Sequence, residues 1–212
     1  MTGAPPPPPS AERVFSTGLP TAVRFADMLC GAGVERGLIG PREAERIWSR
    51  HLLSSASLVD LVPVDAAVVD LGSGAGLPGI PMAIARPDLN VTLVEPMLRR
   101  TRFLEEVVAT LGLPVSVRRA RAQELAPASC QIVVARALAP LRELLEITLR
   151  LLKPGGELLA VKGDRAEAEI AEAADILRAA PDVRVSLDSC GQGEDTVRVV
   201  RVALPHEKLG VR

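Results

Sequence analysis

Glycines dominate the stretch VVDLGSGAGLPGIP, residues 68–81, which begins with a hydrophobic run. Asp70 closes that run, and Gly72, Gly74 and Gly76 follow at alternate positions. Glycine lets a backbone approach a ligand closely and adopt turns that a side chain would forbid. A strand, a glycine-rich turn and a helix in this order place backbone N–H groups at the carboxyl edge of a sheet, where nucleotide-like ligands bind. The stretch therefore predicts a cofactor-binding turn rather than a tight turn without a ligand.

Two cofactors compete for this turn. Gly74, Gly76 and Gly79 match the G-x-G-x-x-G dinucleotide fingerprint, but only in a frame shifted from the first glycine. Counted from Gly72, the pattern is the D-x-G-x-G-x-G loop of S-adenosyl-L-methionine sites. Asp70 favours the second interpretation, because a carboxylate there accepts the ammonium group of a methionine moiety and repels a pyrophosphate.

Two features further along the chain bear on the choice. Glu95 follows a second apolar run, where an acid accepts both hydroxyls of a ribose. NAD and S-adenosylmethionine sites share this feature, so Glu95 indicates adenosine without deciding between them. LLKPGGELLAVKG, residues 151–163, predicts a helix that ends in a Lys-Pro-Gly-Gly turn and feeds a strand. That turn recurs in class I methyltransferases, and its place after the glycine loop tips the prediction toward S-adenosylmethionine.

Arg136 ends the apolar run of VVARALAP, residues 133–140. In a doubly wound sheet this strand ends beside the transferable methyl group. The Asn/Asp-Pro-Pro-aromatic turn that polarises an exocyclic amine is missing, and no Pro-Cys pair offers a nucleophile, since Cys130 precedes the run. The chemistry must then work on an atom with a free lone pair, such as guanine N7, with proximity supplying most of the rate. Arg136 is the predicted catalytic residue, a donor to guanine O6, a phosphate or the cofactor carboxylate.

Positive charge is concentrated between Met97 and Arg121, although the whole chain has a net charge of −1. This segment holds six arginines and two acids. A run of this kind is usually a solvated helix face. Because the arginines flank the carboxyl edge of the predicted sheet, an electrostatic seat for RNA backbone is the alternative.

Short β-branched runs alternate with helical stretches after residue 64 and supply the scaffold for these side chains. The predicted strands are Ala67–Leu71, Val91–Glu95, Val115–Arg119, Ile132–Ala135, Glu157–Lys162, Val183–Leu187 and Thr196–Ala203. The predicted helices are residues 77–86, 99–112, 140–152 and 166–179. This alternation predicts an α/β fold, the doubly wound, Rossmann-like sheet of class I methyltransferases. The sheet is expected to be mostly parallel, with a final hairpin that places an antiparallel strand at its edge.

The chain before this sheet has a different character. Apolar residues in 11–64 recur at helical spacing, with Phe25 in a first helix and Trp48 in a second, so an N-terminal helical cap is predicted. Residues 1–10 predict a disordered proline-rich tail. The methyltransferase domain is expected to occupy residues 65–212.

Composition narrows the class of protein. The 212 residues, 48% of them hydrophobic, suit one medium domain with a small appendage. Three scattered cysteines and two histidines fit a reducing cytoplasm and predict neither a metal site nor a disulfide framework. The first residues resemble no secretory signal and no run is long enough for a bilayer, so a soluble protein without a membrane partner is predicted. One Trp, three Phe and no Tyr argue against stacking of many bases on exposed rings.

Taken in order, these motifs resemble the bacterial RsmG (GidB) family. DLGSGAGLPGIP, RPDL, EPMLRRTRFL, RAQE, ARALAPL and LLAVKG match the family's pattern, and with RHLLSS they span about residues 46–163. The L-P-G-I-P extension after the glycines is the most specific piece, because generic methyltransferases lack it. VERGLIGPRE is similar to the actinobacterial branch.

The resemblance implies methyl transfer from S-adenosyl-L-methionine to N7 of a guanine in the decoding-region loop of 16S rRNA. The implied partner is 16S rRNA, the small ribosomal subunit or its assembly intermediate, and a monomer in the cytoplasm is expected. The predicted cofactor contacts are Asp70, Gly72, Gly74, Gly76, Leu77, Glu95, Ala122, Gln123 and Arg136. The predicted RNA contacts are Arg99, Arg100, Arg119, Arg121, Lys162 and His51.

Two positions depart from the family's pattern. Gln123 stands where the family usually has Glu. The glutamine keeps a hydrogen-bond acceptor but carries no charge. Ser54 in RHLLSS replaces the family's acid.

The nearest alternative function is methyl transfer to another RNA, a protein or a small molecule. Alternatives of other classes are a nicotinamide-dependent oxidoreductase and a non-catalytic regulator that binds S-adenosylmethionine.

Overall fold

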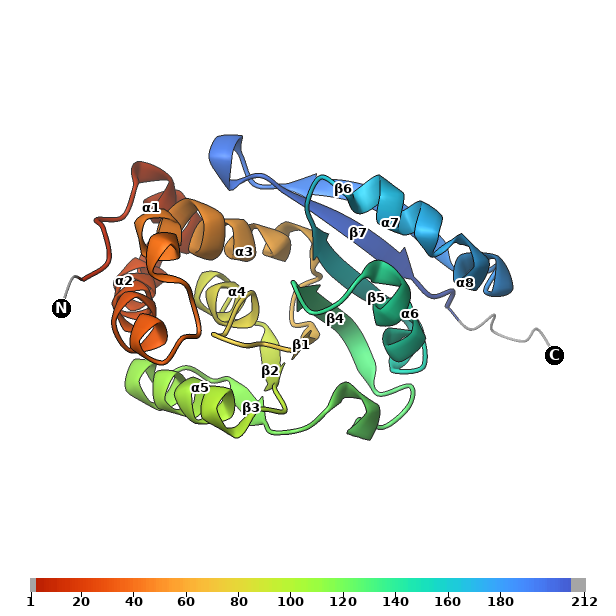
Figure 1. Cartoon of the computed structure of the whole chain (residues 1–212), viewed down its shortest axis with the longest axis horizontal. Coiled ribbons are helices and arrows are strands. Elements are labelled where there is room, and N and C mark those ends of the chain that lie inside the picture. Colours follow the sequence, from red (N-terminus) through yellow and green to blue (C-terminus); the bar gives the residue numbers. More distant parts are fainter. Residues whose placement is uncertain (1–2, 207–212) are drawn as a thin grey trace.

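The structure, a computed structural model, describes residues 3–206. Within these residues seven strands form one sheet in the order β3-β2-β1-β4-β5-β7-β6 (Figure 1). They are β1 (Ala67–Leu71), β2 (Asn90–Val94), β3 (Ser116–Arg118), β4 (Cys130–Arg136), β5 (Leu152–Lys162), β6 (Arg184–Cys190) and β7 (Val197–Ala203). Strands β1 to β5 run parallel, whereas β7 pairs antiparallel with both β5 and β6. The predicted doubly wound sheet with an antiparallel pairing at its edge is confirmed.

Helices cover both faces of this sheet. Those that follow the strands are α4 (Gly79–Ala85), α5 (Leu98–Leu111), α6 (Leu141–Thr148), α7 (Ala166–Glu172) and α8 (Ala174–Ala179). Alternate residues of a strand point to opposite faces, and β4 shows this: Val134 packs in the cluster with α4 and α5, whereas Val133 packs in the cluster with α6. In Figure 1, α4 and α5 lie on one side of the sheet and α6 to α8 on the other.

The N-terminal helical region packs on the α4 side (Figure 1). Its helices are α1 (Pro9–Phe15), α2 (Leu19–Met28) and α3 (Ser54–Ala56), joined by 3₁₀ turns at Ser16–Gly18, Pro41–Arg46 and Ser57–Leu61 and by π turns at Leu29–Gly33 and Ile47–Leu53. Phe25 and Leu52 are fully buried and belong to the same apolar cluster as Ile80 of α4 and Leu93 of β2. The cap and the sheet therefore share one core, although the sequence predicts a domain boundary at residue 64 between them.

The first described residues lie against this cap. Trp48 Nε1 donates a hydrogen bond of 2.7 Å to the Pro5 carbonyl, and the Ala4 amide donates to Asp27 at 2.9 Å. Helix α1 begins at Pro9, because proline's fixed φ and missing N–H suit a first helical turn. Residues 3–10 thus make specific contacts, which differs from the disordered tail predicted for 1–10.

Two boundaries differ from the prediction. The Lys-Pro-Gly-Gly segment does not end a helix: α6 stops at Thr148, and Leu152 already pairs with Cys130. The register then shifts, so that Lys153–Gly156 bulges out before Glu157 resumes pairing with Ile132. The helix predicted over 166–179 is broken at Ala173, which leaves α-helical geometry between α7 and α8.

Candidate active site

The glycine-rich turn between β1 and α4 takes the shape that its sequence predicts. Gly72, Gly74 and Gly76 have φ values of +70°, +57° and +92°, a region that residues with a side chain rarely adopt. Space is also restricted, since a Cβ added to Gly76 would lie 2.4 Å from Ile80 Cδ1. The turn therefore needs glycine for both conformation and close packing.

Asp70 lies fully buried near the end of β1, next to this turn. Its Oδ2 accepts a hydrogen bond of 3.0 Å from the Gly79 amide, while Oδ1 is, within residues 3–206, a buried side-chain oxygen with no partner. Burial raises the pKa of Asp70 to about 7, against the hydrogen bonds that favour its charged form. A buried acceptor without a donor is costly, so this oxygen is suited to a cationic ligand group such as an ammonium.

Glu95 ties the end of β2 to the same turn. The side chain is 1% exposed. Oε2 accepts from the Gly74 amide at 3.0 Å, and Oε1 accepts from the Met97 amide at 2.9 Å. Arg100 approaches Oε2 at 3.7 Å. The carboxylate thus lies beside the glycine turn, as its place at the end of the second predicted strand leads one to expect, and its contact with a ribose stays a prediction.

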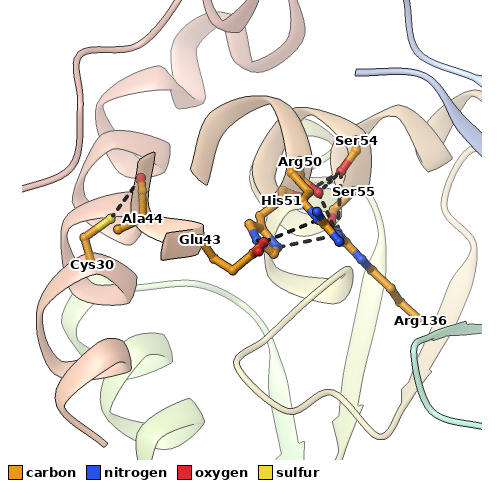
Figure 2. Close-up of polar contacts among 8 residues, drawn as sticks. All are labelled: Cys30, Glu43, Ala44, Arg50, His51, Ser54, Ser55 and Arg136. Carbon is orange, nitrogen blue, oxygen red and sulfur yellow. Dashed lines mark hydrogen bonds and ion pairs between the residues drawn. The ribbon is translucent and has the colours of Figure 1, made fainter. Parts of the chain in front are cut away.

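Arg136 reaches from the carboxyl end of β4 into the helical cap (Figure 2). Nη1 donates to Ser55 Oγ at 2.8 Å, and Nη2 donates to the Arg50 carbonyl at 2.6 Å. Longer contacts join the guanidinium to the His51 carbonyl, His51 Nδ1 and Ser54 Oγ, at 3.4 to 3.5 Å. Burial lowers the pKa of Arg136, and the charge of Arg50 lowers it further. The arginine therefore fixes the cap to the edge of the sheet where the glycine turn lies.

His51 extends this cluster on the cap side. Its Nε2 lies 2.7 Å from Glu43 Oε2 (Figure 2). Burial lowers the pKa of His51, Arg136 lowers it further, and Glu43 opposes both. Because Arg136 can only donate, Nδ1 must accept from it, which leaves the proton of a neutral ring on Nε2, facing Glu43. The His51 side chain is only 11% exposed, so it lies inside the cap rather than on a surface open to RNA.

A cleft of about 780 Å³ opens between the cap, the turn after β4 and the ends of β5 and β7. Its lining is mostly polar or basic and comprises Arg46, Arg50, Ser54, Arg136, Ala137, Leu138, Ala139, Pro140, Val161, Lys162, Gly163, Asp164, Glu169, Thr196, Val197 and Arg198. A second pocket of about 500 Å³ lies at the ends of β2 and β3, lined by Pro96, Met97, Arg119, Ala120, Arg121 and Glu124. Strand β1, which carries Asp70, lies between β2 and β4 in the sheet, so Asp70 stands between the strands that border the two hollows.

The family of the chain is shown by comparison with known proteins. A family model described as GidB, rRNA small subunit methyltransferase G, matches residues 19–197. The chain belongs to the GidB family. Ribosomal RNA small subunit methyltransferase G of Frankia casuarinae is 50% identical over 212 residues, covering 95% of this chain and 80% of its own length. Its namesake from Streptomyces avermitilis is 49% identical over 213 residues, covering 98% and 90%.

Solved structures agree on the fold of this GidB-family chain. A SAM dependent methyltransferase from Aquifex aeolicus superposes with a TM-score of 0.55 at 17% identity, covering 82% of this chain and 98% of that one. At this identity the likeness shows the fold alone. Within residues 3–206, no three His, Cys, Asp or Glu side chains are grouped as metal ligands, and no helix is long and apolar enough to span a membrane.

Of the other predicted site residues of the GidB-family chain, two line the smaller pocket. Arg119 and Arg121 line the smaller pocket, and Ala122 and Gln123 follow it in a 3₁₀ turn whose carbonyls accept from Arg150. Leu77 is half-buried after the glycine turn, and Arg99 is exposed on the first turn of α5.

The position of Lys162 differs from the one expected of an RNA contact. Its side chain is 8% exposed, and Nζ lies 2.7 Å from both Glu169 Oε2 and the Ala139 carbonyl. The ammonium group is therefore engaged inside the protein, against the turn that follows Arg136.

Several residues of the site gave no signal of their role in the sequence. Ser55 and Arg50 lie within the RHLLSS motif, but their partner Arg136 is more than eighty positions away. Glu169 and Arg198 belong to no motif, and only the packing of α7 and β7 beside β5 brings them to the cleft.

Proposed function

We propose that this chain transfers a methyl group from S-adenosyl-L-methionine to N7 of a guanine in the decoding-region loop of 16S rRNA, in the cytoplasm. The observation that carries the proposal is its identity of about 50% to two proteins named ribosomal RNA small subunit methyltransferase G, over almost the whole chain. The cleft supports the same conclusion, since its lining residue Leu138 lies against Gly72 and it carries arginines that suit a polyanion.

The residues of the glycine turn fit S-adenosylmethionine better than a dinucleotide. The unpartnered Oδ1 of Asp70 needs a donor or a cation, which an ammonium group provides and a pyrophosphate does not. Glu95 offers acceptors beside Gly74 for ribose hydroxyls. The residues proposed to hold the cofactor are Asp70, Gly72, Gly74, Gly76, Leu77, Glu95, Ala122, Gln123 and Arg136.

Guanine N7 carries a lone pair and no proton, so its methylation requires no side chain of the cleft to remove a proton. S-adenosylmethionine supplies an electrophilic methyl group on a sulfonium. The N7 lone pair forms the new bond to the methyl carbon, the carbon–sulfur bond breaks with its electron pair staying on sulfur, and no proton has to leave N7. A general base is therefore not needed. The histidine and the cysteine nearest in sequence to the site are also not placed to act as base or nucleophile: His51 faces Glu43, and Cys130 is buried at the opposite end of β4 from Arg136.

Methyl transfer to small ribosomal subunits tests the proposal. Subunits from a strain that lacks the gene would be incubated with the purified protein and labelled S-adenosylmethionine. We expect label in one 16S rRNA guanine that then becomes cleavable by borohydride and aniline. Binding of S-adenosylmethionine without such cleavage would overturn the substrate assignment, and binding of NAD(H) in its place would overturn the cofactor assignment. Deproteinised 16S rRNA and assembly intermediates, assayed in parallel, identify the form that is methylated.

A further inference from the structure

The turn between β4 and α6, residues 137–140, presents an apolar side chain at the mouth of the cleft. Leu138 is 41% exposed, although large hydrophobic side chains are otherwise exposed in residues 3–206 only at Val64, Met97 and Leu98. Leu138 lines the cleft, and the other three do not. Leu138 lies with Ala137, Ala139 and Pro140 along this wall of the cleft, and their apolar atoms offer a ligand a surface to pack on.

This turn is held rigidly. Ala137 has a φ of +52°, which costs a non-glycine residue about 1 kcal/mol or more and persists only where the surroundings enforce it. The surroundings include a half-buried ion pair, Lys162 with Glu169. Lys162 donates to the Ala139 carbonyl and Glu169 accepts from the Leu141 amide, each at 2.7 Å. The C-terminal side of the turn is thereby held through one pair of charges on β5 and α7.

Leu138 also lies between the glycine turn and the cleft. A Cβ added to Gly72 would lie 2.5 Å from Leu138 Cδ1, so the leucine lies directly against the glycine turn. Its other side faces the cleft, where Arg46, Arg50 and Arg198 supply positive charge. An atom that approaches the glycine turn from the cleft therefore passes beside Leu138.

We propose that Leu138 is the platform on which the methyl-accepting purine packs, a positioning and specificity residue for the proposed reaction, on which this inference rests. A purine buries a flat apolar face, and the residues that line the cleft include no aromatic side chain to stack on it. Leu138 is the large apolar side chain next to the glycine turn that takes this place. Contact with one face of the base orients the edge that carries N7 toward the methyl group, and the fixed turn keeps that orientation without further ordering.

Substitution of Leu138 tests this role with the full-length protein. Leu138→Ala should lower kcat/KM for methyl transfer to unmethylated small subunits by about tenfold or more, because the apolar contact of the leucine side chain with the base is lost. The dissociation constant for S-adenosylmethionine, measured by calorimetry, should change less than about twofold, and the thermal midpoint should not change. Leu138→Phe should retain or exceed the wild-type value because a ring offers a larger face. Val64→Ala, an exposed apolar residue before β1, is the matched control and should behave as wild type.

Three results would overturn the inference. Weaker binding of S-adenosylmethionine with kcat/KM reduced only in proportion would mean that Leu138 covers the cofactor turn. An unchanged kcat/KM in Leu138→Ala would mean that no base packs there. An equal loss in Leu138→Phe would mean that the site needs the shape of leucine and not an apolar face. If the wild-type protein methylates no subunit, the proposed function itself has failed, and that outcome is distinct from these three.

Discussion

Asp70 combines complete burial, an unpartnered oxygen and a pKa of about 7, compared with an ordinary value of 3.8. Between those two pH values the unfolded chain has lost the proton and the folded chain has kept it. Folding stability contributed by this group must then fall as pH rises from about 4 to about 7, by about 1.4 kcal/mol per pH unit, and level off above. Asp70→Asn should remove that part of the slope, as measured by urea unfolding at about pH 5, 6 and 7 without cofactor.

The same experiment with saturating S-adenosylmethionine provides the control. A bound ammonium next to Oδ1 favours the carboxylate, so the wild-type slope should flatten, whereas Asp70→Asn should be stabilised much less by the cofactor. Identical slopes for the two proteins in the absence of cofactor would show that Asp70 ionises normally in the folded chain.

At the residue scale, the sequence predicted groups that act along one strand and its following turn. Asp70, Glu95 and the glycines met as expected, because the carboxyl ends of neighbouring parallel strands must share an edge. The direction of a long side chain was not predictable in this way. Lys162 and His51 both turn inward to carboxylates, Glu169 and Glu43, because a polar group close to the core needs a partner more than it needs solvent.

At the scale of elements, β5 and α7 fix the turn after β4 through the Lys162–Glu169 pair. Lys162→Met should destabilise the fold by about 2 kcal/mol, since it leaves the half-buried carboxylate of Glu169 with one donor fewer. Glu169→Gln should cost less, and the double variant should recover part of the stability that Lys162→Met removes. A double-mutant cycle by urea unfolding measures the coupling, and additive effects would show that the two side chains do not act as a pair.

The same variants separate an internal role of Lys162 from contact with RNA. Removing one cation that touches a phosphate lowers the salt dependence of binding by about one unit of log Kd against log salt. Arg46 is exposed at the cleft, so Arg46→Gln should lower that slope. Lys162→Met should leave the slope unchanged and lower kcat instead. A reduced salt slope in Lys162→Met would show instead that Lys162 contacts RNA.

The elements themselves were predictable wherever one period governed a segment. The strand expected at 67–71 appears with the same bounds, and the glycine turn leads directly into α4. The Lys-Pro-Gly-Gly segment was not predictable, because its conformation depends on a partner in another strand. Leu152 pairs with Cys130 ahead of the bulge, which local turn propensity alone does not reveal.

For the whole molecule, the shared core of cap and sheet and the Arg136 contacts predict that both unfold as one cooperative unit. Trp48, the single tryptophan, is buried in the cap, so its fluorescence follows the cap while far-ultraviolet circular dichroism follows the whole chain. The two urea transitions should coincide. Ser55→Ala removes an acceptor of the Arg136 guanidinium. It should lower the free energy of unfolding by about 1.5 kcal/mol or more and move both midpoints together to lower urea concentration. An earlier transition of Trp48 alone, enlarged by Ser55→Ala, would show instead that the cap opens from a sheet that stays folded, and the cleft between them would then be a transient feature of the molecule.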